Sequence, residues 1–228
     1  MSSEPKSVSV IIPALNEQDS IGLVIRDIPK HLVNEIIVVD NGSTDRTWEV
    51  AQNAGVRVVS ENRRGYGAAC LRGIASARNP DIIVFMDGDY SDYPEEMEQI
   101  ISPILNGEAD LVMGSRMEGT KSMKALPPHA YWGNRLATRL IDLIYHHRFN
   151  DLGPFRAIRA SRLRELGMED KNYGWTVEMQ VKALKRGLRV AEVPVRYRKR
   201  LGKSKVSGSW SGSIKAGFKI IATILELR

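Results

Sequence analysis

Short apolar runs alternate with amphipathic segments through the first half of the sequence, and this alternation limits the folds open to the chain. Strands are expected at residues 8–12, 35–40, 56–59, 82–86 and 111–114, separated by helices at 21–31, 44–54, 67–78 and 94–105. Runs rich in Val and Ile, without a polar residue at every second position, are typical of strands buried on both faces. The sequence therefore predicts an α/β fold in which helices flank a mostly parallel central sheet.

The second half of the chain is less regular. We expect a strand at 190–196 and helices at 131–147, 172–186 and 213–227. The last of these helices is amphipathic, because apolar residues recur at helical spacing at Ile214, Phe218, Ile221 and Leu225. We treat residues 1–228 as a single domain made of two halves, 7–115 and 116–205, followed by a C-terminal helix within 206–228.

The charge balance is basic. The 33 Lys and Arg residues outnumber the 27 Asp and Glu residues, which gives a formal net charge of +6. This balance favours an anionic partner such as nucleic acid, anionic lipid or a phosphorylated small molecule. Nucleic acid is not expected, because no helix-turn-helix, zinc-finger or aromatic-basic RNA signature is present.

Two further features of the sequence bear on compartment. No apolar run approaches the roughly 18–20 residues that cross a bilayer, and residues 1–7 lack the pattern of a signal peptide. The single cysteine, Cys70, excludes an internal disulfide and a cysteine-based zinc site. We therefore expect a cytoplasmic protein without a transmembrane tail.

The strongest motif is Asp87-Gly88-Asp89, which directly follows the strand expected at 82–86. Two carboxylates at a strand end, separated by a residue too small to crowd a ligand, suit a hard divalent cation that also binds phosphate oxygens. The alternative is a simple turn, because Asp and Gly are common turn residues.

Polar segments also follow the three preceding strands, at 13–17, 40–45 and 62–67. Because the carboxyl ends of parallel strands share one edge of a sheet, these segments would form one rim where a ligand binds. An acid there can accept hydrogen bonds from ribose hydroxyls, and Gly65 and Gly67 would let the backbone approach a ligand closely. Each segment has a structural alternative, since Asn16 and Asp45 would also cap helices.

The order of these motifs resembles family 2 glycosyltransferases, which have the GT-A fold, a single Rossmann-like domain. The strand-end motifs that carry the resemblance are Pro-Ala-Leu-Asn-Glu at 13–17, Asp-Asn-Gly-Ser-Thr-Asp at 40–45, Asn-Arg-Arg-Gly-Tyr-Gly at 62–67, Asp-Gly-Asp at 87–89 and Gly-Ser-Arg at 114–116. Later motifs are similar to the branch that contains dolichyl-phosphate mannose and dolichyl-phosphate glucose synthases; they lie at 151–156, 175–179, 192–194 and 200–205.

The resemblance implies an enzyme, an inverting hexosyltransferase that uses a nucleotide diphosphate sugar, UDP-glucose or GDP-mannose. The residues that would bind this donor are Pro13, Leu15, Glu17, Asp40, Gly67, Asp87, Gly88, Asp89, Arg200 and Lys205. The residues that would act in catalysis are Asp89, Arg116 and Glu178. The resemblance places residues 7–115 on the nucleotide-sugar side and residues 116–205 on the acceptor side.

The resemblance also implies a divalent metal cofactor, Mg²⁺ or Mn²⁺, that neutralises the charge of the leaving nucleotide. Asp87 and Asp89 would bind this metal. Relatives often carry Gln two positions after the second aspartate as a further metal contact, whereas this chain has Ser91 followed by Asp92. The third ligand is therefore Ser91, Asp92 or water.

The expected acceptor is a polyprenyl or dolichyl phosphate. It would meet basic residues at Arg116, Lys124, Arg135, Arg139 and Arg156. A phosphate acceptor is already anionic and needs no general base, whereas a hydroxyl acceptor would need one, for which Glu178 is the candidate. The first alternative is thus the same donor chemistry onto a hydroxyl of a glycan, lipid headgroup or small metabolite, and the remote one is a non-catalytic nucleotide-sugar binder.

The last helix leaves two interpretations open. It would either lie on an anionic membrane surface, as a peripheral contact with the cytoplasmic face, or pack its apolar side against the domain. The sequence leaves the oligomeric state open.

Overall fold

The computed structural model describes residues 6–117, 128–202 and 210–228, with the backbone only for 210–214. Among these residues, seven strands form one sheet in the order β3-β2-β1-β4-β6-β5-β7. Their bounds are Val8–Ala14 (β1), Glu35–Asp40 (β2), Arg57–Ser60 (β3), Ile82–Phe85 (β4), Leu111–Ser115 (β5), Arg156–Arg159 (β6) and Val190–Pro194 (β7). All neighbouring strands are parallel except β6, which runs antiparallel between β4 and β5. The expected mostly parallel sheet is confirmed.

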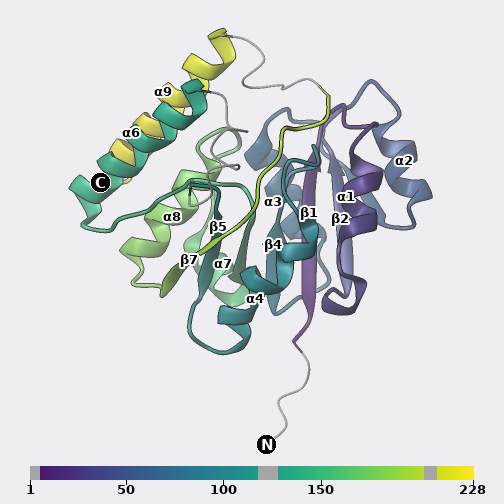
Figure 1. Ribbon diagram of the computed structural model, residues 1–228, viewed down its shortest axis with the longest axis horizontal. Helices are drawn as coiled ribbons and strands as arrows, with labels where there is room; N and C mark the ends of the chain where they lie inside the picture. Colours follow the sequence, from purple (N-terminus) through teal and green to yellow (C-terminus); the bar gives the residue numbers. More distant parts are fainter. Residues whose placement is uncertain (1–5, 118–127, 203–209) are drawn as a thin grey trace, which may run out of the picture.

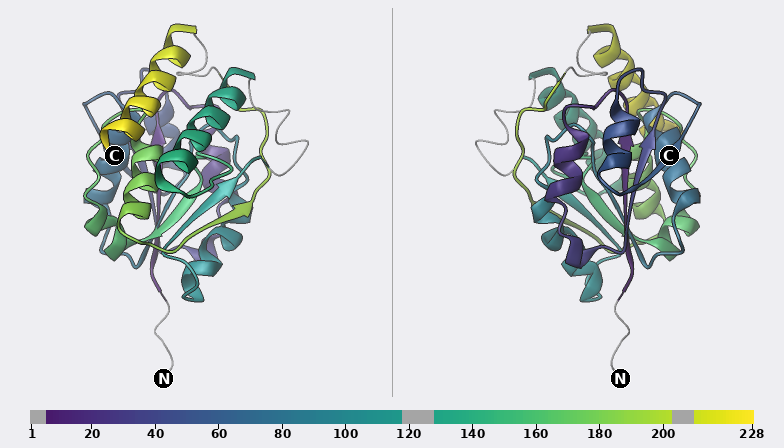
Figure 2. Two further views of the ribbon diagram at one scale, coloured as in Figure 1. Left: turned by 90° about the vertical axis from the view of Figure 1, so that its left-hand side faces the viewer. Right: turned by 90° about the vertical axis from the view of Figure 1, so that its right-hand side faces the viewer.

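Helices cover both faces of this sheet (Figures 1 and 2). On one face lie α1 (Ile21–Asp27), α2 (Thr47–Asn53), the short turns η1 (Lys30–Leu32) and η2 (Pro94–Glu96), and α4 (Met97–Leu105). On the other face lie α3 (Tyr66–Ser76), α6 (Pro128–Tyr145), α7 (Ala160–Leu166), α8 (Trp175–Lys185) and α9 (Trp210–Glu226).

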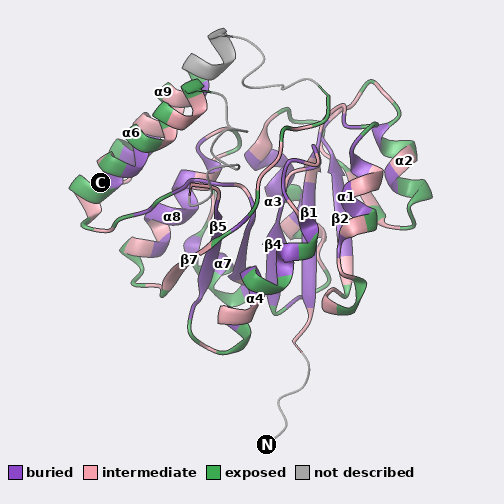
Figure 3. Ribbon diagram, in the orientation of Figure 1, coloured by how far each residue is buried: buried purple, intermediate pink, exposed green. Residues whose placement is uncertain are grey.

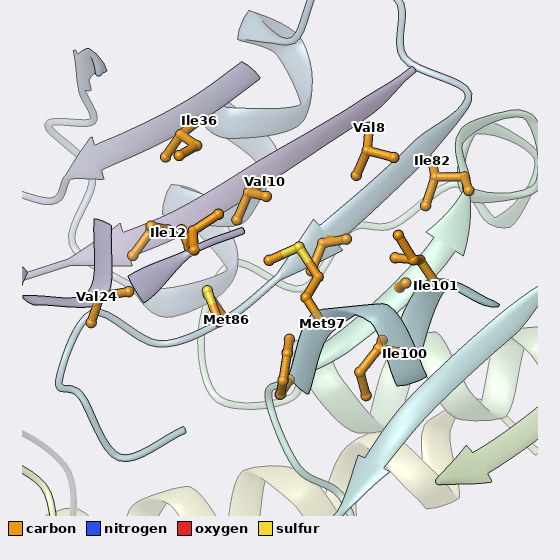
Figure 4. Packing of buried hydrophobic residues seen from close by; sticks show 14 of the residues in the cluster. Val8, Val10, Ile12, Val24, Ile36, Ile82, Met86, Met97, Ile100 and Ile101 are labelled. Carbon is orange, nitrogen blue, oxygen red and sulfur yellow. The ribbon is translucent and has the colours of Figure 1, made fainter. Parts of the chain in front are cut away.

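The central strands are buried on both sides, which explains their unbroken apolar runs. In β1, Val10 and Ile12 pack into the core beneath α1 and α4 (Figure 4), while Ile11 packs into the opposite core with α3 and α8. All three side chains have no exposed surface. Each such aliphatic side chain contributes roughly 1.5–3 kcal/mol when it is fully buried.

Two elements were not predicted from the sequence, β6 and α7. The β6 segment has arginine at both ends, which hides it from a search for apolar runs. It is nevertheless buried, because Arg156 donates hydrogen bonds to backbone carbonyls and Arg159 pairs with Asp110. The other predicted elements are present and end within four residues of the expected bounds, and the segment expected as one helix at 94–105 divides into η2 and α4.

The carboxyl ends of β1, β2 and β3 meet at one edge of the sheet. In register, Asp40 of β2 lies beside Ala14 of β1 on one side and Ser60 of β3 on the other. The segment after β7 climbs to this same edge (Figure 1), where the backbone N–H of Leu201 donates to the carbonyl oxygen of Asp89 at 3.0 Å. The edge therefore collects residues from both halves of the chain.

The helices α6 and α9 lie side by side at one end of the molecule and carry exposed residues along their outer sides (Figure 3). In α9, Ile224 is fully buried, whereas Phe218 and Leu225 are exposed. None of the helices in the described parts of the chain is long and apolar enough to span a bilayer.

At the opposite ends of the strands, Asp110 directly precedes β5 and should stabilise the fold in a pH-dependent way. Its carboxylate accepts hydrogen bonds from the backbone and guanidinium of Arg189, and these bonds lower its pKa to about 2. Because the folded pKa lies below the unfolded value of 3.8, the stabilisation is complete at neutral pH and disappears as the pH falls toward 2. We expect Asp110→Asn to lower the free energy of unfolding by about 2 kcal/mol at pH 7.

Urea unfolding of the wild-type protein and of Asp110→Asn at pH 7 and pH 3 measures this effect. The difference between the two proteins should shrink by roughly half at pH 3. A difference that does not change with pH would show that the charge of Asp110 is not the cause.

Candidate active site

A cavity of about 310 Å³ opens at the carboxyl ends of β1 and β4; we call it the strand-end cavity. It is lined by Pro13, Ala14, Leu15, Glu17, Asn41, Arg64, Gly65, Tyr66, Ala69, Asp87, Gly88, Asp89, Asn172, Tyr173 and Arg200. Most of the residues predicted to bind the donor are therefore together here, namely Pro13, Leu15, Glu17, Asp87, Gly88, Asp89 and Arg200.

Five further polar and aromatic residues line the cavity: Asn41, Arg64 and Tyr66 belong to the predicted strand-end segments 40–45 and 62–67, whereas Asn172 and Tyr173 were missed by the sequence analysis. Asn41 follows Asp40 directly, so the polar strand-end segment was the signal that could have identified it. Its amide donates to the carbonyls of Glu61 and Arg63, and its side-chain oxygen accepts from the N–H of Gly65. The predicted Asp40 is buried beside the cavity, where its carboxylate accepts the backbone N–H of Ser43 at 3.3 Å.

The two carboxylates of the Asp-Gly-Asp motif have different surroundings. Asp89 is buried, and its Oδ1 accepts hydrogen bonds from the backbone N–H of Ser91 at 2.9 Å and from the Ser91 hydroxyl at 2.5 Å. Asp87 Oδ1 is buried and accepts no hydrogen bond in the described structure. Burial and the nearby charge of Asp89 raise the pKa of Asp87 to about 7. A buried carboxylate oxygen without a hydrogen-bond partner, next to a second carboxylate, is suited to a cation.

The neighbouring residues Ser91 and Asp92 do not complete a three-carboxylate site. The Ser91 hydroxyl donates to Asp89 and so orients that carboxylate, and its oxygen lies beside the position that a metal on Asp89 would take. Asp92 is buried, and neither of its carboxylate oxygens has a hydrogen-bond partner. The described residues contain no group of three Asp, Glu, His or Cys side chains close enough to hold one metal ion.

Arg200 brings a positive charge to the same carboxylates from the far end of the chain. Its Nη2 donates to Glu17 Oε1 at 2.7 Å, and its Nη1 lies 3.2 Å from Asp89 Oδ2. The segment that carries Arg200 is attached to the motif by backbone hydrogen bonds, from Arg198 to Ser91 and from Leu201 to Asp89. Arg200 thus places a positive charge in the strand-end cavity, beside the carboxylates of Glu17 and Asp89.

Arg116 lies at the end of β5 and forms a buried ion pair with Asp151. Its Nε and Nη2 donate to the two carboxylate oxygens of Asp151 at 2.7 and 2.8 Å, and its backbone N–H donates at 2.9 Å. Its guanidinium also lies 5.0 Å from the centre of the Tyr197 ring.

A second cavity of about 310 Å³, the basic cavity, begins one residue away from this ion pair. It is lined by Met117, Tyr131, Arg135, Thr138, Arg139, Asp142, Arg148, Phe149 and Asn150. The structure thus brings together Arg135 and Arg139, both predicted to bind the acceptor, and adds Arg148, which the sequence analysis missed. Three arginines against one aspartate make this cavity suitable for an anion.

The sequence profile of glycosyl transferase family 2 matches residues 9–167. The chain belongs to this family. An uncharacterised glycosyltransferase of Mycobacterium tuberculosis is 38% identical over 215 residues, which cover 92% of this chain and 94% of the relative. A dolichyl-phosphate hexose transferase of Haloferax volcanii is 31% identical over 227 residues, which cover 97% of this chain and 95% of the relative.

Among solved structures, the chain is similar to glucosyl-3-phosphoglycerate synthase from Mycobacterium tuberculosis in complex with Mn²⁺, uridine diphosphate and phosphoglyceric acid. The TM-score is 0.79 at 27% identity, and the match covers 97% of this chain and 78% of the synthase. The comparisons confirm a glycosyltransferase with the GT-A fold and the resemblance to the dolichyl-phosphate branch, and the metal in the synthase structure is a divalent cation, Mn²⁺.

The residues of this glycosyltransferase fit such a metal. Asp87 supplies a buried oxygen without a partner, and Asp89 supplies a carboxylate that already attracts the cationic Arg200. Two carboxylates are a sufficient protein contribution for Mg²⁺ or Mn²⁺, because these ions take their remaining ligands from water and substrate phosphates.

Two predicted site residues have structural roles instead. Arg156 is fully buried, and its guanidinium donates to the backbone carbonyls of Gly153 and Thr176. Burial lowers its pKa to about 10. Gly67 is also buried, and a Cβ atom built on it would lie 2.1 Å from the carbonyl oxygen of Asp170. The structure therefore corrects both predictions. Arg156 does not line the basic cavity, and the absence of a side chain at Gly67 makes room for the backbone of Asp170 rather than for a ligand.

Glu178 is likewise engaged within the protein. Its carboxylate is buried, accepts the backbone N–H groups of Glu169 at 2.9 Å and Asp170 at 2.8 Å, and pairs with Lys182 at 2.6 Å. These internal partners occupy the carboxylate, and Glu178 is not among the residues that line the strand-end cavity. The structure does not support Glu178 as the general base. Two other predicted residues, Lys124 and Lys205, lie outside the described residues.

Proposed function

We propose that this glycosyltransferase transfers a hexose, with inversion, from a nucleotide diphosphate sugar to a polyprenyl or dolichyl phosphate. The observation that carries the proposal is the strand-end cavity, in which Asp87, Asp89 and Arg200 meet. The branch is favoured by the relative named as a dolichyl-phosphate hexose transferase and by a Methanococcus voltae relative, 27% identical over 248 residues, whose name specifies UDP-N-acetylglucosamine and dolichyl phosphate.

In this proposal the strand-end cavity binds the donor. Asp87 and Asp89 would hold the metal, and Ser91 would keep the Asp89 carboxylate oriented. When bound, the metal supplies positive charge to the leaving diphosphate. Arg200 would leave its pairs with Glu17 and Asp89 and donate to the diphosphate, which adds a second fixed cation where negative charge develops.

The acceptor would enter from the side of the basic cavity. Its phosphate oxygen is already a nucleophile, so the reaction proceeds without a protein base, in agreement with the internal partners of Glu178. Arg135, Arg139 and Arg148 would bind the phosphate; Arg116 directly precedes Met117 of this cavity, and its charge acts to lower the pKa of Asp87.

The exposed apolar residues near the basic cavity suit a lipid-linked acceptor. On α6 and α9 these residues are Trp132, Leu136, Leu143, Phe218 and Leu225. Together with the arginines of α6 they would allow peripheral contact with the cytoplasmic face of an anionic membrane.

A second candidate keeps the donor chemistry but uses a hydroxyl acceptor. It is favoured by the similarity to the synthase whose structure contains phosphoglyceric acid, a phosphorylated small molecule. The basic cavity would accommodate such a phosphate equally well. Against this candidate, Glu178 is not free to act as the required base.

An acceptor panel distinguishes these functions. The purified protein with Mn²⁺ is incubated with UDP-glucose, GDP-mannose or UDP-N-acetylglucosamine, and with a polyprenyl phosphate, a phosphorylated small acceptor or no acceptor. We expect nucleoside diphosphate release and a glycosylated lipid product only with the polyprenyl phosphate. Transfer to the small acceptor alone would favour the second candidate. Donor binding without release under any condition would indicate a non-catalytic binder.

A further inference from the structure

One wall of the strand-end cavity comes from a turn that the sequence motifs did not identify. Asn172 and Tyr173 line the cavity and belong to residues 169–174, which lead into α8; we call this segment the α8 turn. Nothing in the predicted donor site included it, although its residues border the cavity beside Gly65 and Tyr66.

The α8 turn is held tightly against the start of α3. The backbone N–H of Ala68 donates to the carbonyl of Lys171 at 3.0 Å, and that of Gly67 donates to the carbonyl of Asn172 at 3.3 Å. A Cβ atom on Gly65 would lie 2.0 Å from the carbonyl oxygen of Lys171. No space remains between the two segments, so a displacement of the α8 turn would change the cavity.

Two buried carboxylates hold the turn from inside. Glu178 accepts the N–H groups at its start, as described above. Asp170 accepts the N–H groups of Asn172 at 2.7 Å and Gly174 at 3.1 Å. Asp170 therefore fixes the backbone on both sides of the lining residue Tyr173.

The countercharge of Asp170 comes from the C-terminal helix. Lys219 Nζ of α9 lies 3.0 Å from Asp170 Oδ2, and the hydrogen bond to Asp170 raises the pKa of Lys219. The helix also packs closely here, because a Cβ atom on Gly174 would lie 2.5 Å from Thr223 Oγ1. The position of α9 is thus connected to the wall of the cavity through one ion pair and one close contact.

We propose that Asp170 and Lys219 are positioning residues for the donor: α9, through this ion pair, sets the position of Asn172 and Tyr173. The proposal rests on the function proposed for the strand-end cavity. Because the lining residues would contact the donor equally in the ground state and the transition state, loss of the ion pair should weaken donor binding and leave the chemical step nearly unchanged.

Lys219→Gln tests the proposal, with Lys215→Gln as its matched control because Lys215 is an exposed lysine one turn earlier in α9. We expect Lys219→Gln to raise the KM for the nucleotide sugar about three- to tenfold with kcat within twofold, as for loss of uniform binding. The dissociation constant of the nucleoside diphosphate with Mn²⁺, measured by calorimetry, should rise by the same factor. Lys219→Arg should keep the wild-type values, and so should Lys215→Gln.

A second variant protects the test against simple misfolding. Asp170→Asn keeps an oxygen that accepts the N–H groups of Asn172 and Gly174 but removes the charge. It should raise the KM like Lys219→Gln, and the double variant should be no worse than either single one, because both remove the same interaction. Additive effects would overturn the proposal.

The remaining outcomes are also decisive. Three results would each overturn the link between α9 and the cavity. They are an unchanged KM in Lys219→Gln, a KM in Lys215→Gln that rises as much as in Lys219→Gln, and a KM in Lys219→Arg that rises above the wild-type value. If the wild-type protein itself binds no nucleoside diphosphate with Mn²⁺, the proposed function fails and this inference fails with it, whereas wild-type binding with an insensitive Lys219→Gln removes only the link.

Discussion

Asp89→Asn should abolish sugar transfer while the protein remains folded. The amide keeps an oxygen that accepts the hydrogen bonds of Ser91, so the turn after β4 is preserved. What is lost is the negative charge that binds the metal and attracts Arg200. We expect kcat/KM to fall by at least about 10³-fold, which corresponds to about 4 kcal/mol of transition-state stabilisation.

The measurement is nucleoside diphosphate release under the conditions of the acceptor panel, with Mn²⁺ binding followed separately by calorimetry. Asp19→Asn is the matched control, since Asp19 is an exposed acid near the same edge of the sheet. Asp19→Asn should keep both the wild-type rate of nucleoside diphosphate release and the wild-type affinity for Mn²⁺. If Asp89→Asn kept more than a tenth of the wild-type activity, or bound Mn²⁺ as tightly, the metal assignment would be wrong.

The Asp-Gly-Asp motif could be predicted because its position depends on local sequence alone. Apolar strands and short polar connections place Asp87 and Asp89 at the carboxyl end of β4 whatever the rest of the chain does. The same reasoning located the segment 13–17 at the end of β1, and the residues that the resemblance assigned to the donor there, Pro13, Leu15 and Glu17, line the same cavity. In a parallel sheet, the site residues that directly follow a strand can therefore be located from the local sequence of that strand and its connection.

The rest of the site depends on contacts between distant segments. Asn172 and Tyr173 line the cavity because their turn packs on α3, about a hundred residues earlier in the chain. Arg156 binds backbone carbonyls, and Glu178 binds two backbone N–H groups besides the side chain of Lys182; backbone partners have no sequence signature. The resemblance therefore suggested Glu178 as a base and Arg156 as an acceptor ligand, whereas the fold uses both side chains internally.

Arg116 presents the largest expected effect on stability, since it is the countercharge of a fully buried carboxylate. Asp151 has no exposed side-chain surface, and three of its hydrogen bonds come from Arg116. Arg116→Met would leave the Asp151 carboxylate buried, and the backbone N–H of residue 116 would be its remaining donor among the described residues. Removal of one partner from a buried ion pair typically costs 3–5 kcal/mol, and we expect a loss of about 4 kcal/mol in the free energy of unfolding.

Urea unfolding at pH 7 measures this loss, and Arg26→Met is the matched control. Arg26 forms an ion pair of similar length with Asp27 on the surface, so its replacement should cost no more than about 1 kcal/mol. Equal losses in the two variants would mean that the burial of Asp151 does not determine the effect.

A double variant separates the structural role of Arg116 from its proposed contact with the acceptor. Asp151→Asn combined with Arg116→Met removes both charges and keeps an oxygen for the backbone N–H of residue 116. The free energy of unfolding should recover most of the loss, because no uncompensated charge remains in the interior. If Arg116 contacts the acceptor as proposed, transfer to a polyprenyl phosphate should stay low in the double variant, since the guanidinium is still missing. Recovery of stability together with full activity would show that Arg116 serves the fold alone.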